Sequence, residues 1–68
     1  MKNDVNVLKG EITKILHGKE FSKLTIELKS GEKISSVIPR DLAKKKKLKK
    51  GAKVTAAIKA SDVMVTER

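Results

Sequence analysis

The residues best suited to chemistry in this chain surround a break in an alternating pattern near its C-terminus. Residues 53–59 alternate with period 2, as a half-buried strand does, and residues 60–62 interrupt the alternation. The interruption brings together the ammonium of Lys59, the hydroxyl of Ser61 and the backbone N–H groups of Ala60 and Ser61. All of these groups donate hydrogen bonds, and an oxyanion needs donors because it only accepts them. The pattern therefore predicts a site for a small anion.

Alternating apolar residues elsewhere predict the sheet that must position this site. The expected elements are a strand at 5–16 that bends or bulges near Lys9–Gly10, a hairpin at 21–38, a helix at 40–48, and strands at 53–59 and 63–65. Full closure would remove the exposed edges of so small a sheet. We therefore expect an all-β fold, a small five-stranded OB-like β-barrel with one short helix in the connection before the last two strands.

Length and composition limit how this fold can be stabilised. The 68 residues are expected to form a single domain, 1–68, and a chain this short hides only about 60% of the surface that its unfolded form exposes. It has no cysteine and one histidine, which excludes disulfides and cysteine-based zinc sites. Small domains without disulfides or metal sites commonly gain the missing stability by self-association, so we expect a homo-oligomer. With no recognisable signal peptide or membrane-spanning run, a cytoplasmic protein without a membrane partner is expected.

A concentrated positive charge is a second candidate for function. The formal net charge is +9, and residues 40–53 hold eight of the 17 basic residues against one of the eight acidic residues. Phosphate contacts from this segment would give salt-sensitive, sequence-independent nucleic-acid binding, and an acidic protein is the other partner it would suit. The lysines concerned are Lys44, Lys45, Lys46, Lys47, Lys49 and Lys50. Phe21 is the sole aromatic residue, so bases have no stacking platform, which leaves duplex binding through charge alone and an acidic protein partner as the two forms of this alternative.

The segment that carries the anion-site donors also has a distinctive spacing. A glycine turn at Gly51 and the strand around Val54 lead into residues 58–64, which read IKASDVM. This layout resembles the C-terminal signature of the Mop or molbindin family, the TOBE-type molybdate-binding domain, with its run V-K-[AS]-[ST]-x-V-M. The resemblance implies the same small barrel, assembled into a hexamer as a trimer of dimers. It also implies molybdate or tungstate held at subunit interfaces, in a store, buffer or sensor without any cofactor.

A second segment of the resemblance implies additional site residues. The family's Ile-Thr-Ser-Ile-Ile run corresponds to residues 34–38, where Ser35 and Ser36 keep the hydroxyls. By resemblance, both serines are assigned to the oxyanion site together with Lys59, Ala60 and Ser61.

The N-terminal segment departs from the family pattern. The family's Ser-Ala-Arg-Asn-Gln-Leu-Lys-Gly corresponds to residues 3–10, where Asn3 still offers an amide donor but Val5 stands in place of the arginine. An arginine is a strong bidentate donor to oxyanions, and Asp4 beside this position would repel a dianion. A domain that keeps the fold and the oligomer but has lost the ligand is therefore a further alternative.

Catalysis is the function that the sequence favours least. The chain has no phosphate loop, no nucleophile–histidine–acid set and no spacing of metal ligands, so we do not expect an enzyme. Residue types do not discriminate among molybdate, tungstate and sulfate, because that selection depends on the dimensions of the pocket.

Overall fold

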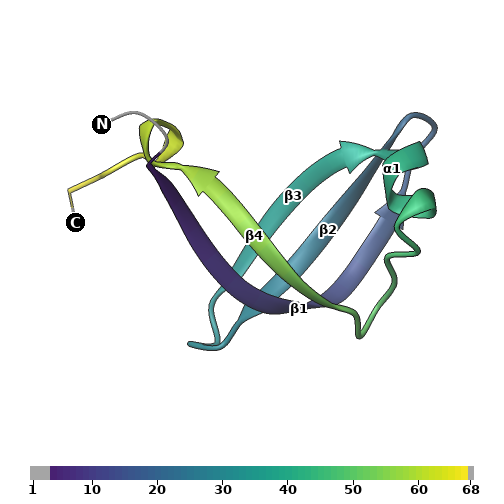
Figure 1. Cartoon of the computed structure of the whole chain (residues 1–68), viewed down its shortest axis with the longest axis horizontal. Coiled ribbons are helices and arrows are strands. Elements are labelled where there is room, and N and C mark those ends of the chain that lie inside the picture. Colours follow the sequence, from purple (N-terminus) through teal and green to yellow (C-terminus); the bar gives the residue numbers. More distant parts are fainter. Residues whose placement is uncertain (1–3, 68) are drawn as a thin grey trace.

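The computed structural model describes residues 4–67, which form one curled antiparallel sheet with a short helix at one end (Figure 1). The elements are β1 (Val5–His17), β2 (Phe21–Leu28), β3 (Lys33–Pro39), α1 (Arg40–Lys45), β4 (Lys53–Lys59) and the 3-10 turn η1 (Ala60–Asp62). The strand order is β3-β2-β1-β4. This curled sheet is the OB-like architecture that the alternation of apolar residues predicts.

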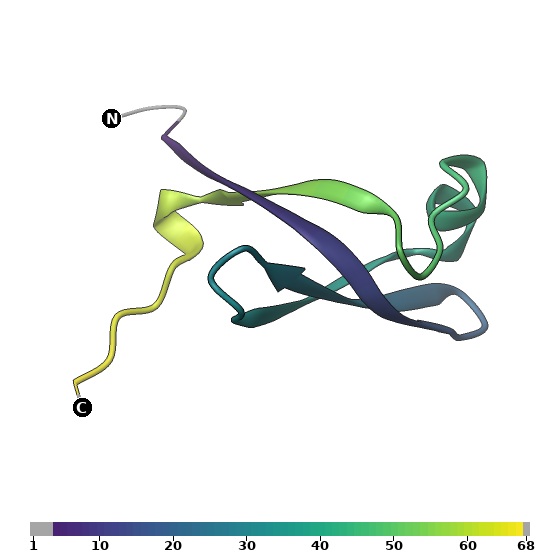
Figure 2. The ribbon, with the colours of Figure 1, turned by 90° about the horizontal axis from the view of Figure 1, so that it is seen from below.

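The long strand β1 connects the two halves of the sheet. Its residues from Val5 to Glu11 pair with β4, and its residues from Gly10 to His17 pair with β2. In Figure 2, β1 crosses from the level of β4 to the level of the β2–β3 hairpin. Gly10 lies at the crossing and pairs with both Leu28 and Val54.

The irregularity in β1 lies further along the strand than the sequence suggested. The register shifts between Ile12 and Lys14, not near Lys9–Gly10. Before the shift even-numbered residues face inward, and after it Ile15 is the half-buried residue. Val5 and Val7, which suggested an earlier change of face, are 46% and 62% exposed. They are apolar residues on the outer face, so their pattern carried no information about the bend.

The core is small and is built mainly by the predicted hairpin. Ile12, Leu24 and Ile26 are buried together, and Ala43 of α1 is buried as well. The hairpin prediction over 21–38 is confirmed by β2 and β3, whose ladder runs from Phe21 opposite Pro39 to Glu27 opposite Lys33.

The helix ends earlier than predicted because of a defined capping structure. α1 stops at Lys45, and Lys47 takes a left-handed conformation with φ 55°. The N–H of Lys47 donates to the carbonyl of Lys44 at 3.0 Å, and the N–H of Leu48 donates to the carbonyl of Ala43 at 3.0 Å. These two hydrogen bonds form a Schellman motif, which usually has glycine at the left-handed position.

The predicted fifth strand at 63–65 is wrong for the residues that the structure describes. After β4, η1 redirects the chain, and the N–H of Val63 donates to the carbonyl of Ala60 at 3.3 Å. Val63, Met64 and Val65 are 48%, 85% and 92% exposed. No sheet edge within residues 4–67 lies beside this segment to form a ladder with it, so the chain runs outward from the sheet (Figures 1 and 2).

A Gly10→Ala substitution should destabilise the fold. A Cβ at this position would lie 2.6 Å from the carbonyl oxygen of Glu27 and 2.7 Å from Cγ2 of Ile26, which is buried. We expect a loss of about 1–3 kcal/mol in the free energy of unfolding, measured by urea denaturation at fixed protein concentration. Gly31→Ala is the control for glycine replacement, since its added Cβ has open space and only its φ of +94° resists the change. Equal stability of the Gly10→Ala variant and the original chain would show that the strands at the crossing are not closely packed.

A Lys47→Gly substitution should stabilise the fold by about 1 kcal/mol, because glycine adopts the left-handed conformation without the steric cost of a Cβ. Lys45→Gly is the matched control: it removes the same charge inside the helix and should cost about 1 kcal/mol. The same urea experiment measures both changes. A loss of stability in the Lys47→Gly variant would contradict the Schellman assignment.

Candidate functional site

The predicted anion-binding turn lies where β4 ends. Lys59 is the last residue of β4 and precedes the 3-10 turn Ala60–Asp62, with φ −59° and ψ 138°. Lys59, Ala60 and Ser61 are all exposed. The ammonium of Lys59 and the hydroxyl of Ser61 are therefore accessible to a ligand at this end of the molecule.

The beginning of β1 forms the other half of this end of the sheet. Val5 lies directly opposite Lys59 in the β1–β4 ladder. The N–H of Ala60 donates to the carbonyl of Asp4 at 3.1 Å, and Nδ2 of Asn6 donates to the carbonyl of Ile58 at 3.3 Å. The position at which the family resemblance expects an arginine is thus beside the lysine of the turn. The Ala60 amide, by contrast, is already engaged within the chain. Asn3, also assigned to the site from sequence, lies outside the described residues.

The two serines of the predicted site lie on β3, at the other edge of the sheet from β4. Ser35 pairs with Thr25 and is exposed, whereas Ser36 pairs with Leu24 and is half-buried on the core side. Successive side chains of a strand point to opposite faces, so the two hydroxyls do not converge on one ligand. In the β-ladders of residues 4–67, β3 has no pairing with β4. The structure therefore brings Val5 and Lys59 together but leaves the serines apart from them.

Apolar side chains surround the turn and are exposed to solvent. They are Val5, Val7, Val63, Met64 and Val65, with exposed fractions from 46% to 92%. Large exposed apolar patches mark surfaces that contact another molecule.

The lysine run lies at the opposite end of the molecule. In Figure 1, α1 and the loop that follows it are on the right, and η1 and the C-terminal segment are on the left. The candidate anion turn and the basic segment are therefore separate surfaces.

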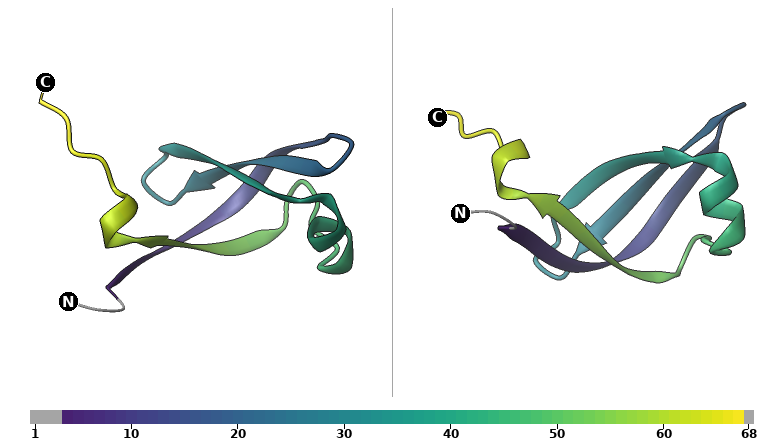
Figure 3. Two further views of the ribbon diagram at one scale, coloured as in Figure 1. Left: turned by 90° about the horizontal axis from the view of Figure 1, so that it is seen from above. Right: turned by 45° about the horizontal axis from the view of Figure 1, so that its top comes forward.

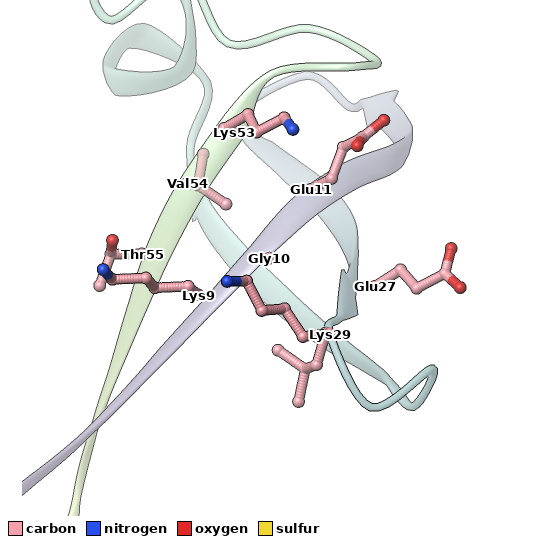
Figure 4. A pocket seen from close by; sticks show the side chains of 9 residues that line it. Lys9, Gly10, Glu11, Glu27, Lys29, Lys53, Val54 and Thr55 are labelled. Carbon is pink, nitrogen blue, oxygen red and sulfur yellow. The ribbon is translucent and has the colours of Figure 1, made fainter.

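A hollow of about 560 Å³, lined by residues of β1, β4 and the end of β2, was not anticipated from the sequence (Figure 4). It is lined by Lys9, Gly10, Glu11, Glu27, Leu28, Lys29, Lys53, Val54 and Thr55. Its three lysines come from different segments, and only the strand register brings them together. Two carboxylates share the surface, and Figure 4 shows Glu27 pointing away from Lys9, which lies beside Thr55. None of the predicted site residues lines this hollow.

Within residues 4–67, no group of three or more histidine, cysteine, aspartate or glutamate side chains could hold a metal ion. Among the same residues, no helix has the length and apolar character needed to cross a membrane.

Comparison with known proteins agrees with the fold. The TOBE domain family matches residues 3–65. The chain belongs to the TOBE domain family. It is 37% identical over 60 residues to molybdenum-pterin-binding protein 1 of Clostridium pasteurianum, and 35% identical over 60 residues to molybdenum-pterin-binding protein 2 of the same organism. In both comparisons 88% of each chain is covered. The resemblance to the Mop family is thereby confirmed.

Solved structures extend this agreement to three dimensions. An apo structure of MopII from C. pasteurianum has a TM-score of 0.88 and 34% identity, covering 91% of this chain and 92% of that one. A molybdate-binding protein from Sporomusa ovata has a TM-score of 0.85 and 27% identity, with 91% of each chain covered. The cytoplasmic molybdate-binding protein ModG, with molybdate bound, has a TM-score of 0.82 and 31% identity over 88% of this chain and 43% of that one. The OB-like prediction is confirmed as the fold of the Mop proteins, with four strands in the described residues.

Proposed function

We propose that this TOBE domain binds molybdate or tungstate in the cytoplasm, at sites formed between copies of the chain, and serves as a store, buffer or sensor. The observation that carries the proposal is the pairing of the start of β1 with the Lys59–Ser61 turn, which juxtaposes Val5 and Lys59 at an exposed end of the sheet. The relatives named molybdenum-pterin-binding proteins and the molybdate-bound ModG structure support the choice of ligand.

The donors at the turn suit a tetrahedral dianion but do not enclose one. The Lys59 ammonium supplies charge, and the Ser61 hydroxyl supplies a hydrogen bond. The net charge of +9 adds a favourable field for any anion that approaches. A buried dianion needs donors on several sides, and one chain offers them from one side only.

A second copy of the chain is proposed to supply the missing donors. Because β3 and β4 are opposite edges of the sheet and do not pair with each other, we assign the Ser35 donor at the turn to another subunit. Ser35 is the better candidate of the two serines because it is exposed, whereas Ser36 faces the core. This arrangement would place the ligand at a subunit interface.

The surface of the single chain also supports self-association. The chain exposes 5961 Å², whereas a monomeric protein of 7.5 kDa exposes about 4,200 Å². Part of the excess belongs to the outward-running segment 63–65, which is apolar. Copies of the chain would cover this segment in an assembly, for which we propose a hexamer built as a trimer of dimers.

Replacing Lys59 by Gln should weaken molybdate binding at least about tenfold, because a hydrogen bond to a charged group contributes about 1.5–3 kcal/mol. Isothermal titration calorimetry measures the change. Lys53→Gln is the matched control, since it removes the same charge at the other end of β4.

Ser35→Ala should also weaken molybdate binding, whereas Ser36→Ala should leave it unchanged. The proposal would be contradicted if neither molybdate nor tungstate released heat on binding to the original chain or raised its melting temperature. That result would favour a domain that keeps the fold without a ligand.

Replacing Val5 by Arg should strengthen molybdate binding about tenfold. Val5 is partly exposed beside Lys59, so an arginine there adds a bidentate cationic donor to the same turn. Val7→Arg is the control, because it adds the same charge two residues further on the same face of β1. Light scattering verifies that the subunit count is unchanged. An equal gain in both variants would mean that charge alone, without the geometry of the turn, sets the affinity.

A further inference from the structure

The strongest feature outside the proposed oxyanion site is the lysine patch, defined here as Lys44, Lys45, Lys46, Lys47, Lys49 and Lys50. All six residues are exposed. They follow one another closely through the end of α1 and the loop to β4, and the right-hand view of Figure 3 places this region away from η1 and the start of β1. No side-chain hydrogen bond within residues 4–67 involves any of these lysines.

The patch is held on an ordered part of the backbone. The two hydrogen bonds of the Schellman motif fix the end of α1, and Leu48 turns inward as a half-buried residue packed against the core cluster. Gly51 then donates to the carbonyl of Ile12 at 2.7 Å, which attaches the loop to β1. The lysines on either side of Leu48 consequently project from a fixed support, so their charges stay concentrated.

Lys47 has the conformation in which glycine is usually preferred. Because a residue with a Cβ is strained in this conformation, the lysine at this position lowers the stability of the fold. An observed backbone outlier of this kind points toward a functional role for the side chain.

We propose that the lysine patch binds the phosphate backbone of double-stranded nucleic acid without reading its sequence. Ammonium groups neutralise phosphates as point charges, which is sufficient for sequence-independent binding. Residues 41–53 contain no asparagine or glutamine, the side chains that read adenine, and no arginine, whose planar fork makes bidentate contacts to guanine. No aromatic residue lies in the patch to stack unpaired bases, which favours a duplex over a single strand.

A protein partner fits this surface less well. Stable protein interfaces have an apolar centre surrounded by a polar rim. Within residues 41–53, Leu42 at 37% exposure is the only large apolar side chain that is exposed, and the exposed Phe21 and Val37 belong to β2 and β3. Charge without an apolar centre suits a phosphate backbone.

Fluorescence anisotropy of a labelled DNA duplex tests this proposal across a salt series from about 50 to 200 mM, the range in which phosphate contacts change affinity most clearly. Each phosphate contact contributes about 0.9 to the slope of log affinity against log salt, so three contacts weaken binding about 40-fold over that range. The variant carrying Lys45→Gln, Lys46→Gln and Lys49→Gln removes three of the six lysines, so its slope should fall by about 2.7 at most. The control carries Lys9→Gln, Lys29→Gln and Lys33→Gln, which remove the same charge elsewhere, and it should keep the slope. Circular dichroism verifies that both variants are folded.

Other outcomes of this experiment would overturn the proposal. These are the absence of duplex binding at low salt, an equal loss in the control variant, and tighter binding of a single strand of the same length. Displacement of the duplex by polyglutamate at equal charge concentration would assign the patch to acidic proteins instead. Lys59→Gln should leave duplex binding unchanged, so this test is independent of the oxyanion site.

Discussion

The double pairing of β1 is the constraint on which the rest of the structure depends. At Gly10 the strand is paired on both edges, with Leu28 of β2 and Val54 of β4. The close approach of β2 leaves no space for a side chain there. Because this crossing fixes the register of the β1–β4 ladder, it also determines that Val5 lies opposite Lys59. The core lies on one side of this crossing and the candidate site lies on the other. Both depend on how β1 pairs with its two neighbours.

The small core supports the proposal that copies of this chain assemble. Four apolar residues are buried among those described, whereas nine large apolar residues are exposed. In a chain of 68 residues, burial within one copy gives only marginal stability. Contacts between copies would bury more of this surface. They would also bring donors from different edges of the sheet together around one ligand, so stability and ligand binding would have a common origin.

The sequence predicted those parts of the molecule that follow from local patterns. The alternation of Leu24 and Ile26 identified the hairpin correctly, and Pro39 marked the start of the helix. The end of the helix was missed because the left-handed position holds Lys47 where glycine is usual. The bulge was misplaced because Val5 and Val7, which are apolar but lie on the outer face, suggested an earlier change of face along the strand.

The candidate site was less predictable because it depends on relations between distant residues. The turn at Lys59 could be recognised from its residues, but the opposite faces of Ser35 and Ser36 became clear only once β3 had a defined position and register. The fifth strand at 63–65 was expected because its residues are apolar and β-forming. A strand also needs a partner edge, and residues 4–67 of one chain provide none for it.

Native mass spectrometry of the intact chain, titrated with molybdate, tests the central claim most directly because it resolves the number of subunits and of bound anions in the same species. The account predicts that molybdate is found only on assemblies of two or more copies, in a fixed ratio to the number of subunit interfaces. A monomer that retains one molybdate as firmly as the assembly does would contradict it.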